Sequence, residues 1–195
     1  MQALPYVLSQ AFNFPPSAVV LDVGCATGNQ LALVSGKLKV GVEPDVASAV
    51  ECLNRGFPVT RAFAEHLPFR SESFDGVICK SVLCLTLEDK AMHEIARVLK
   101  RNGSLYLASN GSGYYLRSLL LGSWKERLYG LRTLLNTWWW IMTNHPLPGF
   151  VGDTMYQSPR RLRRYFKANG MQVVSERQTR FLRFPVFIYT ELRMK

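Results

Sequence analysis

Residues 19–31 read VVLDVGCATGNQL. The apolar residues on either side of Asp22 predict a short buried strand, and the glycines after it predict a tight turn that opens into a helix. Gly24 and Gly28 tolerate backbone angles that other residues avoid, and because they lack side chains a ligand can approach the main chain closely. The first N–H groups of the helix have no partner within it and face the same point. This stretch therefore predicts a small-molecule site at the carboxyl end of the first strand; an ordinary strand-to-helix turn without a ligand is the alternative.

The spacing of the glycines distinguishes between two ligand classes. A dinucleotide-binding loop reads G-x-G-x-x-G, whereas Gly28 comes one residue earlier than that pattern requires. Asp22, just before the turn, would repel a pyrophosphate and suit an amine or a sulfonium. Residues 22–28, DVGCATG, resemble motif I (D-x-G-x-G-x-G) of the class I S-adenosylmethionine-dependent methyltransferases, with Ala26 in place of the middle glycine. This resemblance implies S-adenosylmethionine as the cofactor and contacts to it from Asp22, Gly24, Cys25, Ala26 and Gly28.

A second acid follows at the expected distance along the chain. Residues 38–43 predict a strand that ends in Glu43, 21 residues after Asp22. A carboxylate at the tip of the second strand can accept hydrogen bonds from both hydroxyls of a ribose. We therefore expect Glu43, followed by Pro44, to bind the cofactor. A purely structural role is less favoured, because the sequence shows no other partner for this acid.

Two later segments extend the expected cofactor site. Residues 62–69, AFAEHLPF, are similar to the segment G-D-A-E-x-L-P-F of the same family, whose Asp accepts from the adenine amino group. Phe63 stands in that position, so we expect the adenine to be held by ring contact with Phe63, the backbone of Ala64, and Glu65. Lys80, which ends a strand predicted over residues 73–80, is expected to pair with the cofactor carboxylate or with an anionic substrate. An exposed lysine without such a role is the alternative.

The most specific resemblance is in residues 94–105, EIARVLKRNGSL. They are similar to E-I-x-R-V-L-K-P-G-G-x-L of the small-molecule methyltransferases of the ubiquinone-biosynthesis kind (methyltransferase type 11). The resemblance covers residues 19–109 and implies an α/β, doubly wound, Rossmann-like fold. We expect a seven-stranded, mostly parallel sheet with an antiparallel last strand. Residues 171–179 and 184–192 predict the closing antiparallel pair, after a helix capped by Ser158.

Residues 111–157 depart from a minimal core and predict a helical cap inserted into a single domain of residues 1–195. Their apolar residues predict two or three helices, and the basic residues among them argue against a membrane span. A cap that forms an apolar acceptor pocket is favoured over a cap that only packs on the core, and over helices that lie in a bilayer interface. His145 is the first candidate for a general base, with Tyr114 and Tyr156 behind it.

The net charge of +10 is unevenly distributed. Residues 1–110 contain ten Lys or Arg and ten Asp or Glu, whereas residues 158–195 contain ten and two. A basic C-terminal region suggests an anionic partner, either a nucleic acid, a membrane headgroup or a phosphorylated substrate; a solvated basic face is the alternative. The four cysteines form no C-x-x-C pair, so neither a metal nor a disulfide is expected. Without a signal or spanning segment, we expect a cytoplasmic protein, peripheral to a membrane if the basic region binds lipid.

Together these features predict an S-adenosylmethionine-dependent methyltransferase of a small, hydrophobic or aromatic acceptor, methylated at oxygen, carbon or nitrogen. An RNA methyltransferase that uses the basic C-terminal region is one alternative. Against it, the fourth predicted strand lacks the N-P-P-Y and Pro-Cys motifs of enzymes that methylate nucleic acids. A binding protein that retains the fold without turnover is the other alternative, which Ala26 and Phe63 leave open.

Overall fold

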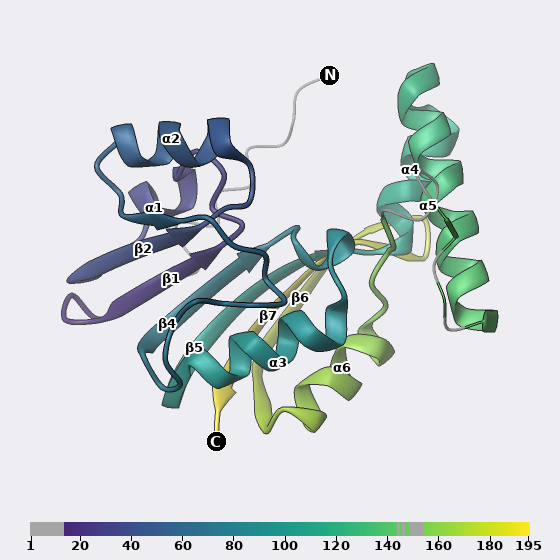
Figure 1. Ribbon diagram of the computed structural model, residues 1–195. Helices are drawn as coiled ribbons and strands as arrows, with labels where there is room; N and C mark the ends of the chain where they lie inside the picture. The colour runs from purple at the N-terminus through teal and green to yellow at the C-terminus, as the bar shows by residue number, and fades with distance from the viewer. Residues whose placement is uncertain (1–13, 144, 146, 149–153) are drawn as a thin grey trace.

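The computed structural model describes residues 14–143, 145, 147–148 and 154–195. Within these residues, seven strands form one sheet in the order β3-β2-β1-β4-β5-β7-β6 (Figure 1). Strands β1 to β5 run parallel, while β7 is antiparallel to both β5 and β6. The doubly wound, mostly parallel sheet with an antiparallel last strand is thereby confirmed. The strands are β1 (Val19–Val23), β2 (Leu38–Val42), β3 (Val59–Thr60), β4 (Phe74–Lys80), β5 (Leu99–Asn110), β6 (Met171–Phe181) and β7 (Phe184–Met194).

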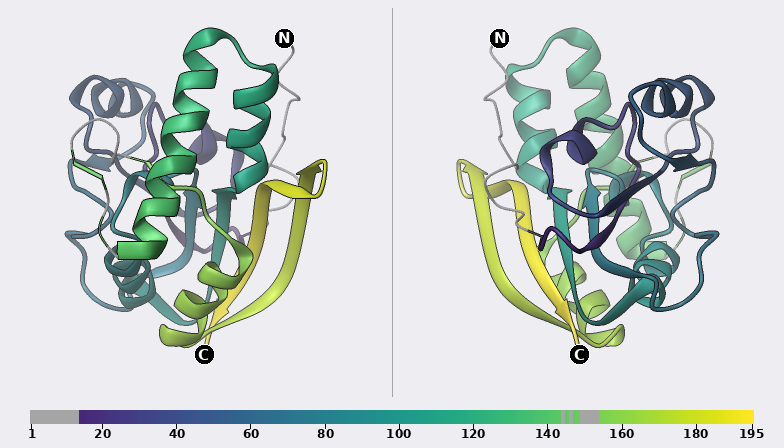
Figure 2. Two further views of the ribbon diagram at one scale, coloured as in Figure 1. Left: turned by 90° about the vertical axis from the view of Figure 1, so that its right-hand side faces the viewer. Right: turned by 90° about the vertical axis from the view of Figure 1, so that its left-hand side faces the viewer.

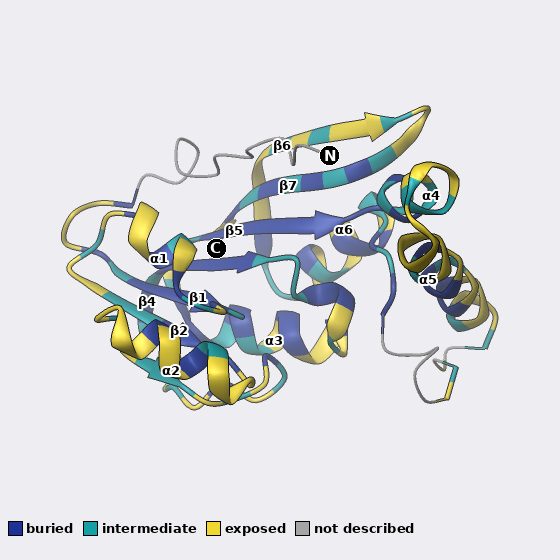
Figure 3. Cartoon of the chain, turned by 90° about the horizontal axis from the view of Figure 1, so that it is seen from above, coloured by how far each residue is buried: buried dark blue, intermediate teal, exposed yellow. Residues whose placement is uncertain are grey.

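Helices cover both faces of the sheet, as Figure 3 shows. Side chains alternate between the two faces along each strand, so Leu21 and Val77 pack beneath α3 and α6, whereas Val20 and Ile78 pack on the opposite side. This burial on both faces accounts for the apolar sequences of the central strands. The helices are α1 (Asn29–Leu33), α2 (Val46–Asn54), α3 (Glu88–Val98), α4 (Ser112–Leu121), α5 (Trp124–Thr143) and α6 (Pro159–Ala168), with a 3₁₀ turn, η2 (Leu83–Leu85).

The capping residues were predictable, but several element ends were not. Asp45 caps α2 by accepting from the Ser48 N–H, and Ser158 caps α6 by accepting from the Arg161 N–H. Helix α1 is short and ends at Leu33, because Val34 already has an extended backbone. Strand β5 begins at Leu99, directly after α3, because Leu99 and Ser104 already pair with β4.

The inserted segment forms a helical hairpin beyond the carboxyl ends of the sheet strands (Figures 1 and 2). Helices α4 and α5 pack against each other, and the turn at Gly122 joins them. Part of the predicted cap, residues 144, 146 and 149–153, lies outside the described residues. Among the described residues, no helix has both the length and the hydropathy needed to cross a membrane.

Candidate functional site

A cavity of about 360 Å³ opens at the carboxyl ends of β1, β2 and β4. Its volume falls within the range of small-molecule sites. Seven of the eleven residues expected to bind the cofactor line it: Gly24, Glu43, Pro44, Phe63, Ala64, Glu65 and Lys80. Six further residues line the cavity without having been predicted from the sequence: Val42, Ala62, Ser81, Val82, Leu85 and Thr86. Three of those, at residues 82, 85 and 86, belong to or flank the 3₁₀ turn after β4, which no motif marked.

The turn after β1 contains three residues in the left-handed region of backbone space. Gly24 has φ 70°, Ala26 has φ 46° and Gly28 has φ 82°. A Cβ atom added to Gly24 would also lie 2.3 Å from Cγ2 of Val82, so this position excludes other side chains on two grounds. Ala26 stands where the motif has its middle glycine, and its backbone conformation favours glycine, so the backbone at Ala26 is strained.

The Glu43 carboxylate holds this turn in place. Its Oε2 accepts from the Ala26 N–H at 2.9 Å, and its Oε1 accepts from the Asp45 N–H at 3.0 Å. The premise that this acid has no protein partner is therefore wrong. Each carboxylate oxygen has a second lone pair, so Glu43 keeps the capacity to accept from ribose hydroxyls. The ribose contact stays a prediction.

Asp22 is buried behind the turn with an unused acceptor. Its side chain is 1% exposed, and Oδ2 has no hydrogen-bond partner among the described residues. Burial raises the pKa of this carboxyl to about 8, the nearby Lys80 ammonium opposes that rise, and Glu43 adds to it. An orphaned buried carboxylate oxygen is energetically costly, and a ligand amine would satisfy it. This atom is the clearest sign that the turn is shaped for a ligand.

The loop of residues 62–69 forms another wall of the cavity, with Phe63 66% exposed at its start. The Glu94 carboxylate accepts from the Leu67 N–H at 2.8 Å, and the Arg97 guanidinium donates to the Leu67 carbonyl at 3.0 Å. Arg97 pairs with Glu94 at 2.6 Å and holds the pKa of that carboxyl below its usual value. The E-I-x-R segment therefore positions this loop.

The remaining residues expected at the cofactor support the turn from behind. Cys25 is buried with its Sγ 3.8 Å from Sγ of Cys52, and burial raises the pKa of the Cys25 thiol. A Cβ on Gly28 would lie 3.0 Å from the same Cys52 sulfur. Neither Cys25 nor Gly28 lines the cavity, so close contact of these two residues with a ligand would involve their main chain; the side chains of Asp22 and Ala26 do not line it either. No group of metal-binding side chains is found in the described part of the chain.

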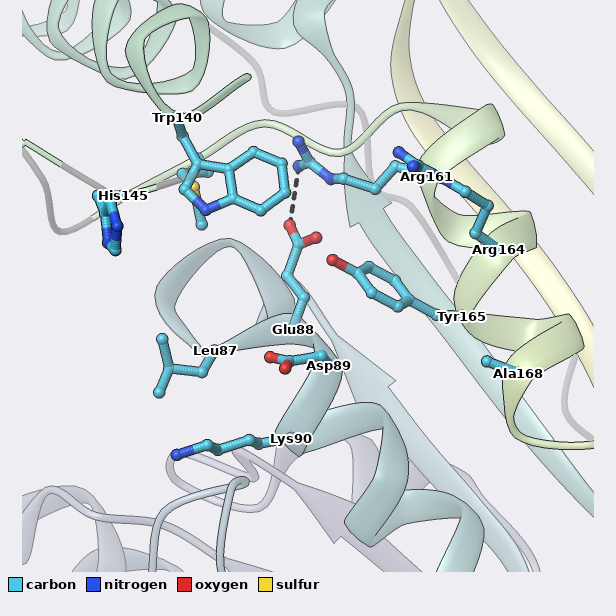
Figure 4. A pocket seen from close by; sticks show the side chains of 11 residues that line it. Leu87, Glu88, Asp89, Lys90, Trp140, His145, Arg161, Arg164, Tyr165 and Ala168 are labelled. Atoms are coloured by element: carbon cyan, nitrogen blue, oxygen red, sulfur yellow. Dashed lines mark hydrogen bonds and ion pairs between the residues drawn. The ribbon is translucent and has the colours of Figure 1, made fainter. Parts of the chain in front are cut away.

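A second cavity, of about 670 Å³, lies between α3, the end of α5 and α6 (Figure 4). On one side Glu88 and Arg161, both almost fully buried, form an ion pair at 2.8 Å. The Arg161 guanidinium lies 4.9 Å from the centre of the Trp140 ring, and Gln157 donates to the same Glu88 oxygen. Burial next to Glu88 raises the pKa of Tyr165. The cavity thus has an aromatic wall beside a fixed buried charge pair.

Of the three candidate bases, only His145 lines this second cavity. Tyr114 instead packs against the rings of Tyr115, at 5.1 Å, and Phe187, at 5.6 Å. The Tyr156 N–H donates to Thr137, and the Tyr156 carbonyl accepts from the Arg161 side chain. Neither tyrosine lines either of the two cavities described above. The two cavities adjoin along the chain, because residues 85 and 86 line the first and residues 87–90 line the second.

Comparison with known proteins agrees with this geometry. Residues 21–107 match the family model described as a methyltransferase domain. An uncharacterised methyltransferase of Bacillus subtilis, YodH, is 37% identical over 98 residues, which are 46% of this chain and 42% of YodH. The tRNA (carboxymethyluridine(34)-5-O)-methyltransferase of Arabidopsis thaliana is 33% identical over 103 residues, 51% of this chain and 26% of that protein. The chain thus matches less than half the length of either relative.

Solved structures share the fold over nearly the whole chain. The structure of a SAM-dependent methyltransferase from Thermotoga maritima superimposes with a TM-score of 0.66. The alignment covers 96% of this chain and 86% of that one at 22% sequence identity. At this identity the likeness concerns the fold, including the strands beyond residue 107.

We predict that Ala26→Gly stabilises the protein by about 1 kcal/mol, because relief of the left-handed Cβ exceeds the entropy that glycine adds to the unfolded chain. Gly24→Ala should destabilise it strongly. Gly56→Ala is the matched control: Gly56 has φ 86°, but an added Cβ would meet nothing within 4 Å. Urea denaturation followed by circular dichroism measures all three. A Gly24→Ala loss no larger than that of Gly56→Ala would contradict the role assigned to Val82.

Proposed function

We propose that this chain, whose residues 21–107 match the family model of a methyltransferase domain, transfers the methyl group of S-adenosylmethionine to a small apolar or aromatic acceptor. The observation that carries the proposal is the orphaned Asp22 Oδ2 behind a turn whose backbone lies open to the first cavity. The proposal does not depend on the relatives' names, because it rests on features of this chain: the carboxyl oxygens of Asp22 and Glu43, the charge of Lys80 and the shape of the turn after β1.

The residues present fit the cofactor. Asp22 supplies an acceptor for its amino group, Lys80 a cation for its carboxylate, and Glu43 the free lone pairs for its ribose hydroxyls. Phe63, which is exposed at the rim, offers a ring face for the adenine. When bound, S-adenosylmethionine supplies a methyl group on a cationic sulfur, which is already activated for displacement. The protein is then required mainly to position the acceptor and to exclude water.

The second cavity is the acceptor site in this proposal. Trp140 gives it a flat apolar wall, and the buried Glu88–Arg161 pair keeps α6 fixed against α3. His145 faces the same space and can take up the proton that an acceptor hydroxyl or amine loses on methylation. Residues 85 and 86 line the first cavity and residues 87–90 line the second, and the proposal requires an acceptor in the second cavity to reach the cofactor in the first.

RNA methylation is the second candidate, and one observation favours it. Helix α6 exposes Arg160, Arg163, Arg164 and Lys167, and two relatives are named as a tRNA methyltransferase or a probable one. Arg163 is partly neutralised by Glu176 at 3.4 Å, which weakens this basic face. The small-acceptor proposal is preferred because the aromatic cavity has a defined volume next to the cofactor site.

Label transfer from S-adenosylmethionine carrying a tritiated methyl group tests the function. The protein is incubated with total RNA and, separately, with the small molecules of a cell extract. Label in an organic-soluble small molecule supports the proposal, label in RNA supports the second candidate, and cofactor affinity without transfer supports a binding protein.

With the acceptor found in this way, His145→Ala should lower kcat by at least about tenfold, because it removes the proton acceptor. Trp140→Ala should raise KM for the acceptor and leave cofactor affinity unchanged. Trp139→Ala is the matched control, since Trp139 does not line the cavity. A smaller loss of kcat in His145→Ala would remove this residue from the catalytic role.

Cofactor binding should release a proton through Asp22. With its pKa raised to about 8, this carboxyl is largely protonated at pH 7, and a ligand ammonium group favours its ionised form. Affinity for S-adenosylhomocysteine should therefore rise between pH 6 and pH 8, at most about tenfold per pH unit. Calorimetry in phosphate and in Tris at pH 7 measures the released proton, and equal heats in the two buffers would contradict the prediction.

The raised pKa of Asp22 also makes the stability of the ligand-free protein depend on pH. Because the folded state keeps a proton that the unfolded state releases, stability is greatest below the unfolded pKa of about 4 and falls as pH rises toward 8. Asp22→Asn should abolish both this decline and the proton release.

Glu43→Ala should lower the affinity for S-adenosylhomocysteine at least about tenfold, because hydrogen bonds to a charged group are strong. Since Glu43 also holds the turn, a second ligand separates the two roles. The wild-type protein should bind the 2′-deoxy analogue less tightly than the parent compound, whereas the variant should bind both equally. A variant that still distinguishes the two ligands would show that Glu43 acts through the turn alone.

A further inference from the structure

Helix α5 has its polar and apolar faces reversed relative to an ordinary surface helix. Its buried residues are Gly130, Arg132, Thr133, Asn136 and Thr137, four of which are polar. This buried face packs against α4 and against residues 154–156. An ordinary helix places its apolar residues on the inner face.

Hydrogen bonds fix this orientation. Asn136 donates to the Thr154 carbonyl at 2.8 Å and accepts from the Leu147 N–H at 2.8 Å. The hydroxyls of Thr133 and Thr154 lie 2.9 Å apart, and Thr137 accepts from the Tyr156 N–H at 3.0 Å. Rotation of α5 to bury its other face would leave these polar groups without partners, so the reversed orientation is stable.

The opposite face forms an apolar strip, which we call the outer strip of α5. Its members are between 43% and 71% exposed and alternate at intervals of four and three residues: Trp124, Leu128, Leu131, Leu135, Trp138 and Met142. This spacing places them on one side of the helix over its whole length. A continuous apolar surface of this kind indicates an interaction site.

The charges around the strip favour an anionic partner. Arg117, Lys125 and Arg127 are exposed on the hairpin, and Lys125 lies 5.5 Å from the Trp124 ring. Along α4 and α5 the one acidic residue is Glu126, whose carboxylate already accepts from Ser123. Two copies of this chain related by a two-fold axis would therefore bring three exposed cations from each hairpin together, with Glu126 as the one acid of each hairpin to offset them. Anionic headgroups supply the missing negative charge, and tryptophan favours the membrane interface.

We propose that the α4–α5 hairpin docks on an anionic membrane surface, with α5 lying in the plane of the interface and its outer strip among the lipid chains. Helix α5 is not apolar enough to cross a bilayer, which agrees with docking in the plane of the surface. The proposal does not depend on methyl transfer and goes beyond it, because it assigns a location to the folded protein.

Vesicle binding by the full chain tests this proposal. Co-sedimentation should occur with vesicles of equimolar phosphatidylcholine and phosphatidylglycerol, and binding should be weaker with phosphatidylcholine alone. Tryptophan emission should shift to shorter wavelength on binding. Lys125→Glu with Arg127→Glu should lower binding to the anionic vesicles about tenfold or more, since each cation near the surface contributes to affinity.

The triple variant Leu128→Ser, Leu135→Ser and Met142→Ser should lose at least about tenfold in binding, because it removes apolar area from the strip. Its matched control changes Leu33, Val50 and Leu53 to Ser; these are equally exposed residues of α1 and α2. The control should bind vesicles as the wild-type protein does. Thermal unfolding checks that each variant is folded.

Two results would overturn the proposal. If the wild-type protein does not co-sediment with anionic vesicles, membrane docking is excluded, whatever the variants show. A wild-type dimer in analytical ultracentrifugation that the triple variant converts to monomer, again without vesicle binding, would show that a second copy covers the strip.

Discussion

The candidate site depends on the carboxylate of Glu43, which joins two turns that are far apart in sequence. Strands β1 and β2 pair with Val23 opposite Val42, so the acid that follows β2 lies next to the turn that follows β1. From there it accepts from the N–H groups of Ala26 and Asp45. The turn after β1 contains three left-handed residues, and the bond from Ala26 to Glu43 holds it together with the backbone bonds that Gly24 and Cys25 donate to the Val42 carbonyl. A ligand would bind to a carboxylate that is already oriented, which lowers the entropy lost on binding.

Other charged residues also shape the site indirectly, by binding backbone groups of the segments around the cavity. Asp75 accepts from the Val19 N–H at 2.8 Å and pairs with Lys100, so it fixes the start of β1. Glu94 and Arg97 do the same for the loop of residues 62–69. Residues 94–105 therefore support a loop of the cavity without lining the cavity themselves. They shape the site by satisfying buried backbone groups, which would otherwise carry a large desolvation cost.

The sequence predicted what local pattern controls. The buried strand before Gly24, the glycine turn itself and the cap at Ser158 all follow from residues within a few positions of one another. The proximity of Val82 to Gly24 and the pairing of Glu88 with Arg161, 73 positions apart, depend on packing that no local pattern encodes. The faces of α5 show this limit most clearly. Periodicity detects that a helix has two unlike faces, but the bonds from Asn136 and Thr133 to residue 154 decide which one turns inward.

That choice also explains the three consecutive tryptophans at the end of α5. Successive side chains of a helix point about 100° apart, so three consecutive tryptophan rings cannot all lie on one face of the helix. With the polar face of α5 held inward, Trp138 points out at 60% exposure, while Trp140 reaches the Arg161 guanidinium at the wall of the second cavity. A buried ion pair such as Glu88–Arg161 seldom adds stability over apolar packing, but it allows few alternative arrangements. The pair therefore holds α6 and Trp140 in one position relative to each other. This position sets the rotation of α5 about its axis, so that the outer strip of α5 faces away from the protein.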